Sequence, residues 1–155
     1  MTDPTTFRGL QVCGFGMPRS ELRRELVDLV LAGTKTATAS LLVEFELDDE
    51  VVPTAGMREA VIDAEDRIVG EIETTECRVV RMADVDNRFA RGEGEGFADA
   101  TAWRRAHEGY WTGYLDDLRA RLEDSSWSLT DDTEIVCQHF RLAERYPRPI
   151  PVGEA

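Results

Sequence analysis

The stretch Ala32-Gly33-Thr34-Lys35-Thr36-Ala37-Thr38 connects two segments of opposite character. Ahead of it, over residues 20–32, apolar side chains recur at the spacing of an amphipathic helix, namely Leu22, Leu26, Leu29 and Val30. Ser20 is a candidate N-cap, and Gly33 suits the left-handed position that ends many helices. Residues 34–43 are rich in β-branched side chains and predict a turn that enters a strand. Lys35 is therefore expected where a helix gives way to a strand.

Downstream, strands and helices follow one another without a regular βα repeat. A β-hairpin is predicted from residues 57–62 and 68–72, and a strand over residues 77–82 continues or follows it. Asp84 is the expected N-cap of a short helix that ends at the glycines of Glu93-Gly94-Glu95-Gly96. The sequence therefore places a glycine-rich, acidic turn directly after a short helix.

The last third of the chain predicts one long helix and one strand. Aromatic and aliphatic side chains recur at helical spacing over residues 101–122. Residues 133–142 have strand propensity, and residues 146–155 predict an extended, loosely held tail. These mixed elements favour an α+β domain whose curled mixed or antiparallel sheet, a small β-barrel, has flanking helices.

Length and composition indicate one globular domain over residues 1–155, with a core of about residues 15–142. The chain is 42% hydrophobic and 32% charged, which are ordinary values for a globular protein. No apolar run approaches the roughly 20 residues of a membrane helix, and residues 1–9 lack the features of a signal peptide. We expect a cytoplasmic protein with no membrane association.

The charge balance restricts the partners that the chain can bind. A net charge of -13 and a pI near 4.5 repel a polyanion, so long DNA is not an expected partner. The local charge of a binding site can differ in sign from the net charge of the protein, because salt screens charges that lie farther away. A small nucleoside or nucleotide remains an expected ligand, RNA remains an alternative, and the sequence makes no prediction of oligomeric state.

The cysteines and histidines predict neither a metal site nor a cofactor site. Cys13, Cys77 and Cys137 lie far apart with no C-x-x-C pair, so they fit neither a disulfide framework nor a zinc site, and buried free thiols are expected. The sequence also contains no P-loop and no dinucleotide-binding glycine motif.

One ordered pattern resembles the ASCH domain, which carries a G-x-K-x-x-T motif. The pattern is a helix, the K-x-x-T stretch of residues 35–38 and the strand that follows. Further resemblance comes in the same order from Thr74–Val79, Glu93–Gly96 and Trp103–His107. Together these segments cover about residues 15–140. The resemblance implies a PUA-like β-barrel with a cleft beside the lysine motif.

The resemblance also implies an activity. A small bacterial branch of the family has the same K-x-x-T pair and a downstream glutamate, and hydrolyses N4-acetylcytidine as an amidohydrolase. Carried over residue by residue, Lys35 is the general base, Thr38 the nucleophile and Glu95 the proton donor, with Glu93 as the neighbouring alternative to Glu95. This chain is longer than that branch.

The chemistry sets a condition on Lys35. A hydroxyl near pH 7 is too weak a nucleophile without a base, and a lysine with a pKa of about 10.4 acts as a base only after burial or a neighbouring cation lowers its pKa. Burial and a neighbouring cation both stay open at this point, and the arginines that could supply the cation are Arg78, Arg81, Arg104 and Arg105. Further ligand contacts are expected from the side chains Thr36, Glu93, Arg78, Arg104 and His107.

Other interpretations of the same residues stay open. Lys35 would also stabilise the C-terminal end of a helix through the helix dipole. A threonine such as Thr38 is common in strands because of its β-propensity alone. The aromatic side chains of residues 101–122 would also pack in a hydrophobic core. Two alternative functions follow: a non-catalytic RNA or nucleotide reader, and a metal-independent ribonuclease, as implied by the wider family.

Overall fold

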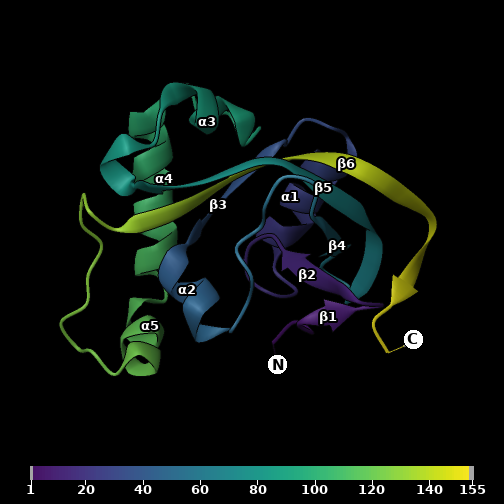
Figure 1. The fold of residues 1–155 in the computed structure, drawn as a ribbon, viewed down its shortest axis with the longest axis horizontal. Coiled ribbons are helices and arrows are strands. Elements are labelled where there is room, and N and C mark those ends of the chain that lie inside the picture. The colour runs from purple at the N-terminus through teal and green to yellow at the C-terminus, as the bar shows by residue number, and fades with distance from the viewer. Residues whose placement is uncertain (1, 154–155) are drawn as a thin grey trace.

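The computed structural model describes residues 2–153 as a single curled sheet with helices packed against it (Figure 1). Six strands are hydrogen-bonded in the order β1-β2-β4-β5-β6-β3. β2 and β4 are parallel, and the other neighbours are antiparallel. The strands are β1 (Thr6–Phe7), β2 (Leu10–Gly14), β3 (Ala37–Leu41), β4 (Arg58–Ile62), β5 (Arg67–Arg81) and β6 (Glu134–Pro151). The predicted α+β class with a mixed sheet is confirmed.

The two longest strands, β5 and β6, form a bent ribbon that gives the sheet its curl. Their pairing shifts register at three places along β5, between Ile68 and Gly70, Glu71 and Ile72, and Thr74 and Glu76. Such irregularities bend a strand and increase its twist. Residues 77–81 continue β5, one of the two options that the sequence left open, and the strand ends one residue earlier than predicted. Residues 146–151 are extended but not loosely held, because β6 still pairs with β5 at Ile150 and Pro151.

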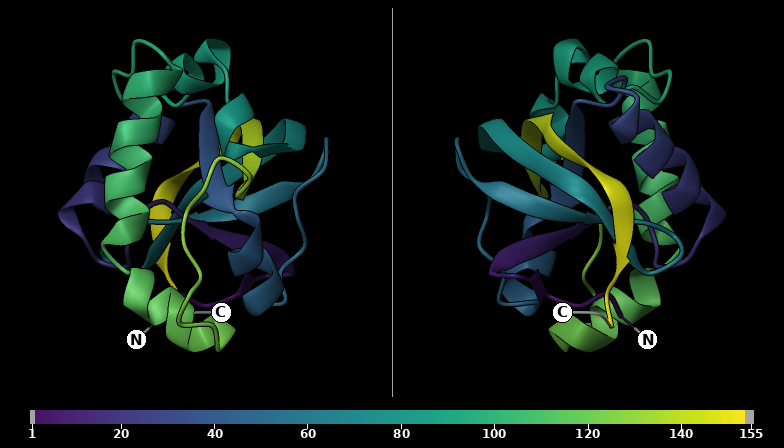
Figure 2. Two further views of the ribbon diagram at one scale, coloured as in Figure 1. Left: turned by 90° about the vertical axis from the view of Figure 1, so that its left-hand side faces the viewer. Right: turned by 90° about the vertical axis from the view of Figure 1, so that its right-hand side faces the viewer.

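Five α-helices accompany the sheet in the part of the chain that the structure describes. They are α1 (Glu21–Leu31), α2 (Leu42–Leu47), α3 (Asn87–Gly92), α4 (Ala100–Thr112) and α5 (Leu115–Leu122), and Met82–Asp84 forms a 3-10 turn. α1 and α4 lie along the same flank of the curled sheet (Figure 2). Over residues 2–153, no helix is both long enough and apolar enough to cross a membrane.

The predicted first helix is confirmed, but its buried face differs by one position. Ser20 caps α1 by accepting a hydrogen bond from the backbone nitrogen of Arg23 at 3.1 Å. Gly33 has the expected left-handed conformation, with φ of 79°. Leu22 is 37% exposed, whereas the side chain of Arg23 is buried. Arg23 takes this inward position because it has polar partners there.

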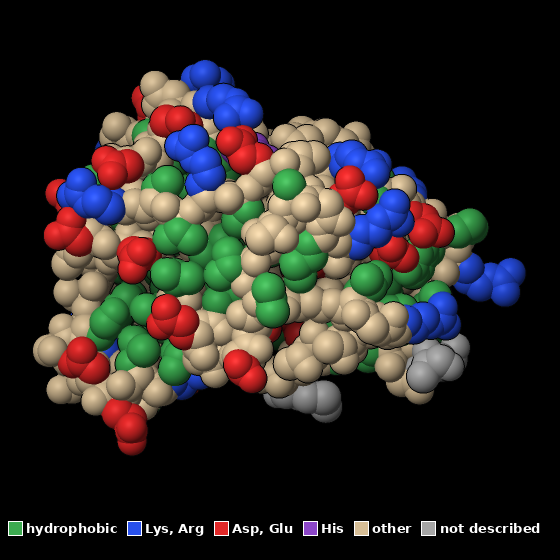
Figure 3. Space-filling model, in the orientation of Figure 1, with side chains coloured by type: hydrophobic (Ala, Val, Ile, Leu, Met, Phe, Trp, Pro, Cys, Tyr) green, Lys and Arg blue, Asp and Glu red, His purple; other side chains and the backbone are tan. Residues whose placement is uncertain are grey.

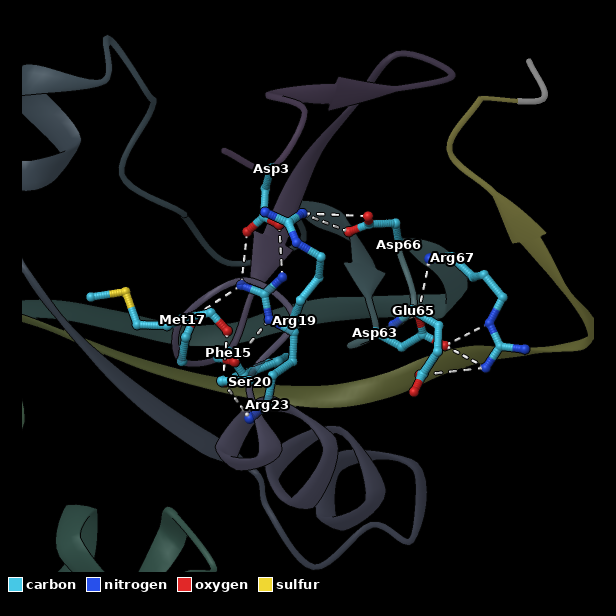
Figure 4. A network of polar contacts seen from close by, with 11 residues as sticks. Asp3, Phe15, Met17, Arg19, Ser20, Arg23, Asp63, Glu65, Asp66 and Arg67 are labelled. Carbon is cyan, nitrogen blue, oxygen red and sulfur yellow. Dashed lines mark hydrogen bonds and ion pairs between the residues drawn. The ribbon is translucent and has the colours of Figure 1, made fainter. Parts of the chain in front are cut away.

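Those partners belong to the N-terminal segment and to the loop after β2 (Figure 4). The Arg23 guanidinium donates two hydrogen bonds to Asp3, at 2.7 and 2.8 Å. It donates two more to the carbonyl oxygens of Phe15 and Gly16, at 3.1 and 2.8 Å. A buried charge with this number of partners is fully compensated. Arg23 therefore ties α1 to residue 3 and to the loop that begins at Phe15.

Three sequence-based boundaries are wrong. The strand predicted to reach residue 43 ends at Leu41, because α2 begins there; Tyr114 donates a hydrogen bond to Glu44 of α2 at 2.7 Å and fixes this helix against the α4–α5 junction. Asp86, not Asp84, caps α3, since its carboxylate accepts from the Phe89 nitrogen. The long helix of residues 101–122 is broken at Gly113 into α4 and α5.

Two apolar clusters pack helices against the sheet. One cluster packs α3, α4 and α5 on the sheet and includes Trp103, Trp111 and Leu118. The other packs α1 on the sheet and includes Phe15 and Phe140. The core role expected for Trp103 and Trp111 is confirmed, because both are almost completely buried.

Candidate functional site

The backbone of Lys35 is fixed on both sides by hydrogen bonds. The backbone nitrogens of Thr34 and Lys35 both donate to Leu29 in the last turns of α1, at 3.0 and 3.1 Å. The nitrogen of Thr36 donates to Gly92 at the end of α3, at 2.9 Å. The lysine therefore lies at the predicted junction, with a position set by two helices and not by a free loop.

The side chain of Lys35 is buried, with 2% of its surface exposed. Its Nζ donates to Oε2 of Glu95 at 2.8 Å and to the carbonyl oxygen of Glu93 at 3.2 Å. Oε1 of Glu93 lies 3.5 Å from the same nitrogen, and the ring of Phe15 lies 5.9 Å away. A buried ammonium is costly unless it is paired, and here two carboxylates pair with it.

Glu93 links Lys35 to His107 on α4. Oε2 of Glu93 lies 3.1 Å from Nε2 of His107. Burial acts to raise the pKa of Glu93, but the His107 contact and the charge of Lys35 outweigh it and hold the pKa of this carboxyl below its usual range. Although the two atoms of the Glu93–His107 contact are close, the contact does not meet the geometry of a hydrogen bond. Glu93 therefore stays ionised beneath Lys35.

A ring stack fixes the orientation of His107. Its ring lies on that of Trp103 with centroids 4.3 Å apart and planes 21° apart. Its Nδ1 lies 2.9 Å from the carbonyl oxygen of Trp103. The indole Nε1 of Trp103 is buried without a hydrogen-bond partner. The Trp103 side chain nevertheless interacts with the Glu93 carboxylate and contributes to the lowered pKa of that group, so the indole is directed at the same carboxylate as His107.

The two glutamates differ in access. The side chain of Glu93 is 2% exposed and that of Glu95 is 20% exposed. Glu95 therefore lies between Lys35 and solvent, at the rim of the site. Gly94 and Gly96, next to it, both have positive φ angles, of 70° and 90°, a conformation that glycine adopts without a steric penalty.

Thr38 lies on β3 and shares a sheet face with a buried polar cluster. It is half-buried and pairs with Gln138 of β6, and paired residues on neighbouring strands point to the same side. Nε2 of Gln138 donates to Oε1 of Glu59 at 2.6 Å and to the hydroxyl of Thr74 at 2.9 Å. Among the contacts of residues 2–153, none joins Thr38 directly to Lys35.

Sequence analysis missed this polar cluster. Burial raises the pKa of Glu59, against the hydrogen bonds from Gln138 and Gln11 that lower it. One signal was available: Glu59 precedes the apolar run Ala60-Val61-Ile62 in a strand, and Gln138 interrupts another apolar strand. A polar side chain at an inward position of such a strand needs a partner.

No hydrogen bond or ion pair in the described structure joins the Lys35 amine to the remaining predicted ligand residues, Thr36, Arg78 and Arg104. Thr36 is exposed, and its hydroxyl donates to the carbonyl oxygen of Gly92 at 3.3 Å. Arg78 is exposed on β5. Arg104 pairs with Glu108 and Asp131. The charged groups in contact with Lys35 are the carboxylates of Glu93 and Glu95. Of the two conditions for a basic lysine, burial is met, and no cation is among the described contacts of its amine.

The cysteines are free, as predicted. Burial raises the pKa of Cys13 well above its usual range, with a further upward contribution from Glu59. Burial also raises the pKa of Cys77 to about 11 and that of Cys137 to about 12. Neutral thiols are poor nucleophiles, so these side chains do not supply one. In the described part of the chain, no three His, Cys, Asp or Glu side chains are grouped to hold a metal ion.

The ordered set of lysine, acidic turn and aromatic helix is that of a known domain. The family model of the ASCH domain matches residues 11–144. The chain belongs to the ASCH domain family. The matched segment contains Lys35, Glu93, Glu95 and His107, and the predicted resemblance to this PUA-like family is thereby confirmed.

Solved structures agree with this assignment. A DUF984 family protein from Enterococcus faecalis V583 is similar with a TM-score of 0.73 and 28% identity, covering 86% of this ASCH chain and 76% of that one. An ASCH domain from Lactobacillus crispatus JV V101 has a TM-score of 0.69 and 23% identity, over 86% and 79%. An ASCH protein from Zymomonas mobilis has a TM-score of 0.54 and 12% identity, over 84% and 70%. No curated protein matches the chain.

Proposed function

We propose that this ASCH domain binds a small modified nucleoside beside Lys35 and hydrolyses an acyl amide on its base, with N4-acetylcytidine as the first substrate to test. The observation that carries the proposal is the buried amine of Lys35, 2.8 Å from the carboxylate of Glu95. A reactive base and a reactive acid in direct contact at the rim of a buried site are the two groups that amide cleavage requires.

The contact supplies a route by which Lys35 becomes a base. Bound substrate excludes water, and in a dry site two opposite charges are less stable relative to the neutral pair than they are in water. One proton then passes from the Lys35 ammonium to the Glu95 carboxylate. This leaves a neutral amine that can accept a proton and a carboxylic acid that can donate one.

The reaction then proceeds in two steps. The hydroxyl of Thr38 attacks the acyl carbon and gives its proton to Lys35, while Glu95 protonates the leaving nitrogen, so that cytidine departs and an acyl ester forms on Thr38. A water molecule next attacks the ester, Glu95 takes its proton, and Lys35 returns a proton to Thr38 as the carboxylic acid leaves. For this step, substrate binding must bring the acyl group between the β3 hydroxyl and the lysine.

The charge distribution of the surface supports a small ligand over a long strand. Many basic side chains pair with acidic ones, as do Arg24 with Glu65 and Arg81 with Asp132. On the face shown in Figure 3, basic side chains likewise stand next to acidic ones. Long nucleic acid binds through continuous clusters of positive charge, whereas a neutral nucleoside needs none.

The test is an incubation of the protein with N4-acetylcytidine, followed by chromatography for cytidine and acetate. We expect turnover that falls at least about 100-fold in Lys35→Met, Thr38→Val and Glu95→Gln, and that persists in Thr75→Val, an exposed threonine on β5. Absence of cytidine at high enzyme concentration would reject the hydrolase. Cleavage of single-stranded RNA without metal, or binding of RNA without cleavage, would instead support one of the two alternative functions.

A further inference from the structure

Glu93 and His107, both predicted from the sequence to contact ligand, have side chains that are largely buried in protein contacts. The side chain of Glu93 is 2% exposed and that of His107 is 13% exposed. Both oxygens of Glu93 are already directed at protein groups, Oε1 at Lys35 and Oε2 at His107. These two residues therefore form a layer behind Lys35, on the side opposite to the rim residue Glu95.

We propose that Glu93 and His107 are positioning residues, which hold the amine of Lys35 against Glu95 and direct its proton to Glu95 instead of to Glu93. The inference rests on the proposed function, because the direction of the proton matters only if Lys35 acts as a base. Its geometric basis is the chain of contacts from Lys35 through Glu93 to His107 and Trp103, in which every group after Lys35 is supplied by the α3–α4 region.

The first support comes from the placement of the two carboxylates on one amine. Glu93 contacts the amine twice, through its carbonyl oxygen at 3.2 Å and its carboxylate at 3.5 Å, whereas Glu95 makes the single shorter contact at 2.8 Å. A proton moves most readily along the shortest and best aligned contact. Glu93 thus orients the amine, and Glu95 is the group in position to exchange a proton with it.

The second support is the charge of His107. Its Nδ1 faces the carbonyl oxygen of Trp103 and its Nε2 faces the Glu93 carboxylate. Carbonyl and carboxylate oxygens are acceptors only, so both ring nitrogens must carry hydrogen for the two contacts to be favourable. With hydrogen on both ring nitrogens, the imidazole stacked on Trp103 balances the negative charge of Glu93, and the NMR experiment below tests this state directly. Glu93 therefore has no need to take the proton of Lys35.

The surroundings of His107 are otherwise aromatic. The rings of Phe97 and Trp111 lie 5.7 and 5.2 Å from the imidazole. Around Glu93, the ionisable groups are Lys35, His107 and the thiol of Cys137, which is kept neutral by burial that raises its pKa to about 12. The net charge of this layer is thus determined by Lys35, Glu93 and His107, and Glu95 lies on the outer side of the amine.

The experiment combines kinetics with side-chain NMR on the full-length protein. Loss of an outer partner of a reactive group typically costs about 10- to 100-fold in activity. We expect Glu93→Gln and His107→Phe to lower kcat for N4-acetylcytidine by that factor with KM nearly unchanged. His107→Gln keeps an N–H that can donate to Glu93, and we expect it to restore part of kcat.

Matched controls come from the second histidine. His139 also lies near a glutamate, with Nε2 3.9 Å from Glu76, but it packs on Phe89 and makes no described contact with the Lys35 amine or with Glu93. We expect His139→Gln and Glu76→Gln to leave kcat unchanged. A rise in KM with unchanged kcat in the Glu93 and His107 variants would show that these residues bind ligand, and would overturn the inference.

NMR separates this inference from the proposed function. In the unmodified protein at pH 7 we expect two ring N–H signals for His107 and a slowly exchanging ammonium signal for Lys35, the second of which is lost in Glu93→Gln. A single ring N–H, or an ammonium signal unaffected by Glu93→Gln, would overturn the positioning role. If the unmodified protein releases no cytidine, the proposed function fails and the proton-directing role with it, while the NMR result still decides whether the pair holds Lys35.

Discussion

Gly94 packs its α-carbon directly against the backbone of Lys35. A Cβ at position 94 would lie 2.8 Å from the Lys35 Cα and would overlap the carbonyl oxygen of Thr34. This close approach brings Glu93 and Glu95, on either side of the glycine, onto the same amine. The glycines of the acidic turn thus have a steric function, which is to let two carboxylates reach one buried lysine.

Gly94→Ala is therefore expected to be strongly destabilising. The positive φ costs an alanine about 1 kcal/mol, and overlap with fixed backbone adds about 1–3 kcal/mol, so we expect a loss of about 3 kcal/mol in urea unfolding. Gly96→Ala is the matched control, since its φ is also positive but a Cβ there has no neighbour within 4 Å. Equal losses in the two variants would contradict a packing role for Gly94.

Replacement of Arg23 tests the N-terminal tie. Arg23→Met leaves the carboxylate of Asp3 without its guanidinium and removes two bonds to backbone carbonyls. Because breaking a buried pair typically costs about 3–5 kcal/mol and Asp3 is partly exposed, we expect a loss near the lower end, about 3 kcal/mol. Arg24→Met, in an exposed pair with Glu65, is expected to cost less than about 1 kcal/mol. Thermal and urea unfolding would compare the two.

Glu50 makes stability depend on pH. Burial, and then the negative charges of Asp48 and Glu59, raise the pKa of Glu50 to about 7 from an ordinary 4.5. The folded protein thus binds this proton more tightly than the unfolded chain, so the contribution is present at low pH and is lost as pH rises from 4.5 through about 7.

Glu50→Gln should remove that dependence. With allowance for solvent screening of a half-buried group, we expect the variant to be more stable than the unmodified protein by about 1 kcal/mol at pH 8, and no more stable at pH 4. Urea unfolding at several pH values measures the difference. Glu46→Gln removes the same charge from an exposed position of α2; a gain there of equal size and pH profile would attribute the effect to net charge alone.

Tyr114 tests the attachment of α2. Its hydroxyl donates to Glu44 at 2.7 Å, and burial raises the pKa of Glu44 despite this bond. Hydrogen bonds to charged groups contribute about 1.5–3 kcal/mol, so we expect Tyr114→Phe to lose about 2 kcal/mol in urea unfolding. Tyr110→Phe, one turn earlier on α4, is the control, because no hydrogen bond of its hydroxyl is present in the described structure. If Tyr114→Phe lost no more stability than Tyr110→Phe, the hydrogen bond from Tyr114 to Glu44 would not be what holds α2 in place.

Helix ends that are marked by a capping residue or by a left-handed glycine were predictable from the sequence. Ser20 and Gly33 bound α1 as expected, since a cap and a left-handed glycine act within one helical turn. Lys35 and Glu95 were both predicted in the site through the family resemblance, and the structure brings them together. The buried face of α1 was misjudged, because nothing local indicates that Arg23 has a carboxylate partner at Asp3.

Features that depend on tertiary contacts were not predictable in this way. Residues 42–47 have side chains suited to a strand but form a helix held by Tyr114, and Gly113 divides a continuous helical pattern into two. An arginine beside Lys35 was one of two ways to obtain a neutral amine, the other being burial, and the fold supplies burial together with two carboxylates. Strand pairing and helix packing determine which charged side chains contact one another. These contacts cannot be predicted from the spacing of residues along the chain.

The position of β3 at the edge of the sheet has a consequence for biosynthesis. Its neighbour is β6, with Ala37 opposite His139, so a ribosome must complete nearly all of the matched domain before the lysine segment can dock. Pairings between distant segments form late because the intervening chain must first be closed into a loop. A nascent chain therefore carries Lys35 and its carboxylate partners long before β3 is paired, and the Lys35 site is complete only when folding is nearly finished.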